Sequence, residues 1–258
     1  MRKYQPYALG IFIGTISLAA LTVLERFSTA KVMLPVLFVW VCIVASIAWI
    51  FQRADRIPKD VFWQSITTIL CMTGLIIVVE VTQVRVFLSL LTAGILAILF
   101  GWYLISPPEI SYSHKPLRRF AMMLWVFDVY ALFTFIFALG AFFPSSILFI
   151  VLNIFSGFFI AAVTIMIWSE YFAAKVQSFF IWTVIVSIAT MELMWVLHLL
   201  PFAYTVLGLL LVWIWYIIQL LVRFHFSTKG ILWKSQIKFL IVNSILYIAL
   251  LVFFVRWV

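Results

Sequence analysis

The chain has 258 residues, of which 67% are hydrophobic and only 10% are charged, and its mean hydropathy is +1.25. A soluble globular domain has about 45–50% apolar and about 25% charged residues, so this composition excludes that class. The net charge of +9 is not gathered into a long basic stretch, which argues against a nucleic-acid partner.

In chain order, charged or proline-containing stretches divide the sequence into segments of about 20 apolar residues, the length of a membrane-crossing helix. The segments are apolar on all sides, whereas the strands of a membrane β-barrel alternate apolar and polar residues. The sequence therefore predicts an all-α, polytopic membrane helix bundle with about nine transmembrane helices, or eight if one span is miscounted. The predicted spans are Tyr7–Leu24, Val32–Phe51, Val61–Val81, Val86–Ile105, Phe120–Phe142, Ser146–Trp168, Ser178–Leu199, Phe202–Val222 and Ile237–Val255.

Two of the predicted turns carry little sequence signal. Only Thr82–Arg85 separates the third span from the fourth, and only Pro201 separates the seventh from the eighth. Residues 61–105 and 178–222 are each too long for one crossing at about 1.5 Å per residue, so each must fold back as a hairpin. Because no connection is long enough for a soluble domain, we expect residues 1–258 to form a single integral membrane domain.

The basic residues predict the orientation of the chain. With the N-terminus in the cytoplasm, only Arg26, Lys31, Arg85 and Arg256 of the 17 Lys and Arg residues fall on the outer side. This is a clear positive-inside bias. We therefore expect a multi-pass protein of the inner (cytoplasmic) or plasma membrane, with the N-terminus inside and, for nine spans, the C-terminus outside.

Two local features predict contacts between spans. Gly10 and Gly14 have the GxxxG spacing, which places two small residues on one helix face and permits close backbone approach, so we expect helix packing there. Glu80 and Arg85 lie at the outer end of the third and fourth spans, where they are candidates for an ion pair.

Four polar residues inside the spans are the candidate functional site. Asp128 lies about 12 Å along the fifth span from its cytoplasmic end, and Glu192 lies about 21 Å along the seventh. Asn153, on the sixth span, falls between these depths, and His198 lies near the outer mouth. The difference in depth argues against direct pairing of the two acids, so we expect Asp128 to be the central group, with Glu192 above it and Asn153 as a bridge.

Three functional hypotheses account for this polar pocket. An ionisable group inside a membrane marks a functional site by default, and acids on a hydrated path suit transport or permeation of a small solute, which we favour. The alternatives are a structural or assembly subunit with a membrane-protein partner or self-association, and a membrane-embedded enzyme acting on a lipid-linked substrate.

Other site types have less support from the sequence. A metal site needs three or four ligands, and the acids and His198 come from two helices at different depths, so we predict no metal centre. No motif identifies a catalytic centre or a cofactor. The one partner that the composition itself predicts is the lipid bilayer.

Overall fold

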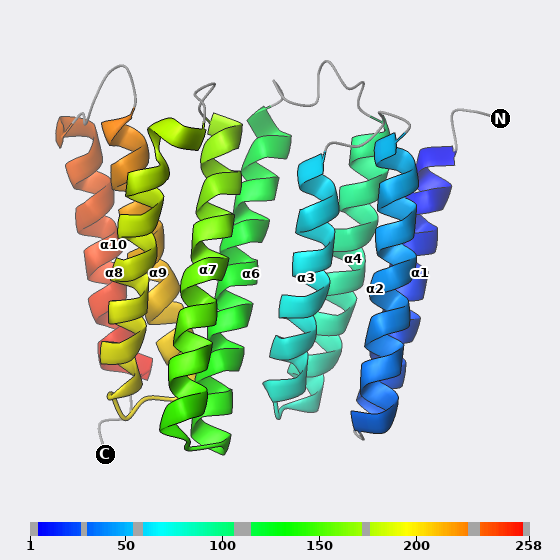
Figure 1. The fold of residues 1–258 in the computed structure, drawn as a ribbon, viewed down its shortest axis with the longest axis horizontal. Coiled ribbons are helices and arrows are strands. Elements are labelled where there is room, and N and C mark those ends of the chain that lie inside the picture. The colour runs from blue at the N-terminus through cyan, green and yellow to red at the C-terminus, as the bar shows by residue number, and fades with distance from the viewer. Residues whose placement is uncertain are drawn as a thin grey trace. The chain divides into compact units, whose positions relative to one another are not determined.

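The computed structural model describes residues 5–26, 30–53, 59–105, 115–171, 176–226 and 233–254, and within these ranges every regular element is a helix. The predicted all-α fold is therefore confirmed (Figure 1). The helices are α1 Gln5–Arg26, α2 Ala30–Arg53, α3 Lys59–Val78, α4 Thr82–Ile105, α6 Lys115–Phe142, α7 Ser146–Tyr171, the 3-10 turn η1 Val176–Ser178, α8 Phe180–His198, α9 Tyr204–His225 and α10 Trp233–Phe254.

Eight helices in the described part of the chain, α1 to α9, are long and apolar enough to cross a membrane. They correspond to the first eight predicted spans, and the chain is a multi-pass membrane protein. The ninth predicted span falls on α10, within which Leu240–Ala249 is an apolar helical segment. Its predicted last residue, Val255, lies outside the described residues, as does Arg256.

The turn between the third and fourth spans differs from the prediction. Helix α3 ends at Val78 and α4 already begins at Thr82, so the connection is 79–81 rather than Thr82–Arg85. Across this connection the Nε and one terminal nitrogen of Arg85 donate to the carbonyl oxygen of Val79 at 3.2 and 2.7 Å. Glu80 is exposed, and within the described ranges no ion pair joins it to Arg85.

The chain divides into two compact units, residues 1–131 and 132–258, with the boundary inside α6. In the first unit α1 packs along α4, α2 packs against both α1 and α3, and α3 packs against α4. In the second unit α8 packs against both α7 and α9. The expectation of one integral membrane domain stays a prediction.

The contact between α1 and α4 is built from small residues. A Cβ atom added at Gly10 would lie 2.7 Å from the carbonyl oxygen of Ala97 and 3.2 Å from the Cα of Gly101. One at Gly14 would lie 3.0 Å from the Cβ of Ala97 and 3.3 Å from the carbonyl oxygen of Ala93. Both glycines of the GxxxG sequence therefore face α4, where their missing side chains let the two backbones approach.

The helices of the second unit are joined by buried polar contacts. Ser187 of α8 donates to the carbonyl oxygen of Gly157 on α7, and the amide nitrogen of Gln219 on α9 donates to the hydroxyl of Thr164 on α7. Such contacts suit a bilayer, where burial of apolar surface contributes little to helix association and polar groups need internal partners.

The α1–α4 packing predicts opposite effects for two glycine substitutions. Gly10→Ala places a methyl group against backbone, so we expect a loss of about 1–3 kcal/mol in the free energy of unfolding. Gly94→Ala is the matched control on α4, because no atom lies within 4 Å of the added Cβ, and helix propensity then favours alanine by up to about 1 kcal/mol.

Unfolding of the purified protein by a denaturing detergent, followed by circular dichroism, measures both variants against the wild type. Equal stability of the two variants would contradict the close packing of α1 on α4.

Candidate functional site

The centre of the candidate site is the side chain of Asp128, which has no exposed surface. Its position in the candidate span Arg119–Phe142 places it about 13 Å from the cytoplasmic end that the orientation predicts, near the middle of the helix. A carboxyl group at that depth costs at least a few kcal/mol unless it is protonated, paired or hydrated. The contacts of Asp128 therefore decide how the fold offsets the cost of burying this carboxyl group.

Helix α3 supplies those contacts. The hydroxyl of Thr68 donates to Oδ2 of Asp128 at 2.8 Å. One turn earlier on α3, the amide nitrogen of Gln64 donates to the backbone carbonyl of Ala121 on α6, also at 2.8 Å. Residues 64 and 68 lie on one helix face because they are four apart. Two polar side chains of α3 thus form hydrogen bonds to α6.

The second carboxylate oxygen of Asp128, Oδ1, is buried without a hydrogen-bond partner among the described residues. The same is true of the indole nitrogen of Trp125, which lies one turn earlier on α6. Buried polar atoms are usually paired, and an unpaired one calls for an explanation such as a chemical role or a bound water or ion. The carboxyl group of Asp128 is therefore half-satisfied: Oδ2 accepts a hydrogen bond from Thr68, whereas Oδ1 is available to a proton, a water molecule or a cation.

In the second unit, Asn153 lies on α7 and His198 is the last residue of α8. Asn153 is buried, and its side-chain oxygen has no partner in the described part of the chain. The ring of His198 stacks on Phe149 of α7 with centroids 4.0 Å apart, and it lies beside Gly140, where an added Cβ would be 3.5 Å from the ring.

Glu192 lies on a different face of α8. The residues that contact α7, among them Ser187, Met191 and Met194, lie on one side of the helix. Glu192 is exposed, in line with Ile188 and Trp195, which are each about half exposed. The carboxyl group is thus about 9 Å from the end of α8 and faces away from the helix pair.

The two acids therefore have contrasting surroundings, buried for Asp128 and exposed for Glu192. Asp128 belongs to the first unit, whereas Asn153, Glu192 and His198 belong to the second. The pocket that combines all four residues stays a prediction.

Sequence reasoning missed Thr68 and Gln64, the two partners that α3 supplies to α6. Their signal was present, because α3 carries buried Gln64, Ser65, Thr68 and Thr73 within an apolar span. Polar residues four apart in such a span identify a face that needs internal partners. Among the described residues, no group of three His, Cys, Asp or Glu side chains is placed to hold a metal ion.

The sequence matches no protein-family model, no curated protein and no solved structure.

The Thr68–Asp128 hydrogen bond predicts a coupled pair of substitutions. Thr68→Val keeps the shape but removes the donor, so we expect a loss of about 1–3 kcal/mol in the free energy of unfolding. With Asp128→Ala already present, the same Thr68→Val change has a much smaller effect, because the acceptor is gone.

The four proteins of this double-mutant cycle are compared by unfolding in mixed micelles. Thr68→Ser serves as the control that keeps the hydroxyl. Additive losses in the cycle would show that the two side chains do not interact.

Proposed function

We propose that the protein moves a small solute or ion across the membrane, with Asp128 as the group that takes up and releases a proton during transport. The observation that supports this most directly is the half-satisfied carboxyl group at mid-span. Thr68 fixes one oxygen, while the other has no partner in the described residues. A half-satisfied buried polar group destabilises a fold unless something offsets that cost, and proton exchange is the role that we propose for Asp128.

Thr68 is suited to both protonation states of Asp128. A hydroxyl donates to an ionised carboxylate, and it also accepts a hydrogen bond from a protonated acid after rotating its own hydrogen. The pair therefore keeps a contact through a cycle of proton uptake and release. This role needs no metal ion and no second carboxylate.

The proposed setting is a cytoplasmic membrane with the N-terminus inside. The bias of Lys and Arg toward one side of the spans supports this orientation. In that setting the α3–α6 pair runs outward from the cytoplasm, and Asp128 lies near the middle of the barrier.

Asp128→Asn tests the proposal, because asparagine keeps the size of the side chain but carries no exchangeable carboxyl proton. In liposomes that contain the purified protein, a potassium diffusion potential drives proton movement, and a trapped pH-sensitive dye reports it. We expect the wild type to conduct protons. The proton flux of Asp128→Asn is expected to be at least tenfold lower.

Glu192→Gln is the matched control, since it neutralises the exposed acid. Thermal unfolding of each variant separates loss of transport from loss of fold. A folded Asp128→Asn variant with wild-type flux, or a wild type with no flux above empty liposomes, would contradict the proposal.

A second candidate function, a subunit of a membrane assembly, is favoured by the exposed carboxyl group of Glu192. An acid on the lipid-facing surface of a span is costly, and intramembrane acids almost always face a protein interior or a water-filled cavity. Coverage of this α8 face by another membrane helix that offers a hydrogen-bond donor would remove the cost. The partner is then another membrane protein or a second copy of the chain.

Reaction with an apolar carbodiimide, which modifies carboxyl groups from within the lipid, tests this candidate. If a partner covers Glu192, the residue is protected in native membranes and modified after the assembly is dissociated in detergent. Glu192→Gln identifies the modified site by mass spectrometry. Equal modification in both preparations would rule out coverage of this face.

A further inference from the structure

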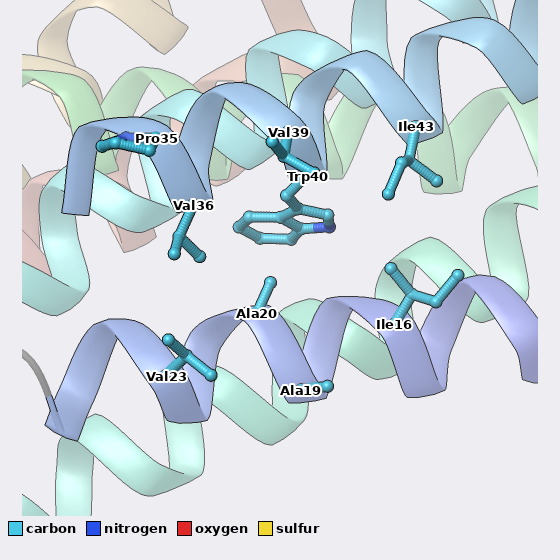
Figure 2. Close-up of a pocket in the computed structure, with 9 residues that line it drawn as sticks. All are labelled: Ile16, Ala19, Ala20, Val23, Pro35, Val36, Val39, Trp40 and Ile43. Atoms are coloured by element: carbon cyan, nitrogen blue, oxygen red, sulfur yellow. The ribbon is translucent and has the colours of Figure 1, made fainter. Parts of the chain in front are cut away.

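A groove of about 410 Å³ runs between α1 and α2 of the first unit (Figure 2). Ala19 and Ala20 line it from α1, and Val36, Val39 and Trp40 line it from α2. Ligand sites commonly have volumes of about 300–1,000 Å³, so the groove is large enough to hold a bound molecule. It arises because two small alanines of α1 face larger residues of α2, leaving a gap that their side chains do not fill.

The lining of the groove is apolar throughout. The one polar atom in it, the indole nitrogen of Trp40, already donates to the hydroxyl of Ser17 at 3.1 Å. Trp40 is almost completely buried, and Ser17 in turn donates to the carbonyl oxygen of Ile13. The tryptophan is therefore a fixed wall, and no group in the groove is available to hold water or a polar ligand.

The extent and lining of the groove suit a hydrocarbon chain. Its lining runs from Pro35 to Ile43 on α2, which corresponds to a length of about 12 Å along the span. Apolar side chains line it over this length, and the lipid around a membrane-spanning helix supplies hydrocarbon chains at that depth.

A basic residue marks one end of the groove. Val23 lines that end, and Arg26 follows three residues later on the same face of α1, in the last turn of the helix. Arg26 is exposed at the end of the span, the depth at which lipid headgroups lie. A guanidinium group there is suited to bidentate contact with a phosphate.

We propose that the groove binds one acyl chain of an anionic phospholipid, with the lipid phosphate held by Arg26. The apolar walls take the chain and the arginine provides the preference for the anionic headgroup. The lipid thereby fills the gap between α1 and α2, whereas the opposite side of α1 packs directly on α4. This site is separate from Asp128, so the lipid-binding proposal and the transport proposal can be tested independently.

Native mass spectrometry of the purified protein tests the site, with phosphatidylglycerol and phosphatidylcholine of identical acyl chains as probes. Wild-type protein is expected to retain one phosphatidylglycerol per chain with at least tenfold higher affinity than phosphatidylcholine. Ala20→Phe fills the groove and is expected to lower retention of both lipids at least tenfold. Arg26→Gln keeps the groove, so retention persists but the preference for phosphatidylglycerol is lost.

Ala8→Phe is the matched control, because Ala8 is an exposed alanine of the same helix outside the groove. Val39→Phe supplies a second way to obstruct the groove from its open side, should Ala20→Phe fail to fold. Equal retention by the wild type, Val39→Phe and Ala8→Phe would overturn the proposal, since it would indicate only general surface lipid. Equal affinity of the wild type for the two lipids would overturn the role of Arg26.

Discussion

The hydrogen bond from Thr68 to Asp128 is the interaction on which the proposed proton exchange depends. Asp128 is buried near the middle of its span, and Thr68 is the one hydrogen-bond donor that the described residues offer its carboxyl group. The nearby bond from Gln64 to the Ala121 carbonyl fixes α3 against α6 at the same face. The other carboxylate oxygen, Oδ1, is buried and has no hydrogen-bond partner among the described residues.

The first unit also shows how a membrane bundle packs when apolar burial gives little preference for one neighbour over another. Gly10 and Gly14 bring α1 close to the backbone of α4, where Ala93, Ala97 and Gly101 face them. On its α2 side the same helix meets larger residues across a gap. A lipid chain in that gap would be part of the packing, and the two faces of α1 would then be stabilised by different means.

Composition and segment length were enough to predict the helical fold and the first eight spans, because about 20 apolar residues have few alternatives in a bilayer. The place of Asp128 near the middle of its helix could also be predicted from the sequence. The side-chain contacts of Asp128 could not be predicted in the same way. Thr68 was not recognised as its partner because pairing depends on which faces of α3 and α6 meet. The outward position of Glu192 was not recognised either, although Thr183, Ser187 and Thr190 recur three to four residues apart on the buried face of α8 and Glu192 lies on the opposite face.

Infrared difference spectroscopy on the protein in lipid bilayers, recorded as the pH is changed, tests the central claim most directly. The carboxyl group of a protonated acid and that of an ionised one absorb at different frequencies. If Asp128 exchanges a proton, the wild type shows a carboxyl band that converts between the two forms and is missing from Asp128→Asn. Identical pH-difference spectra for the wild type and the folded variant would contradict the account.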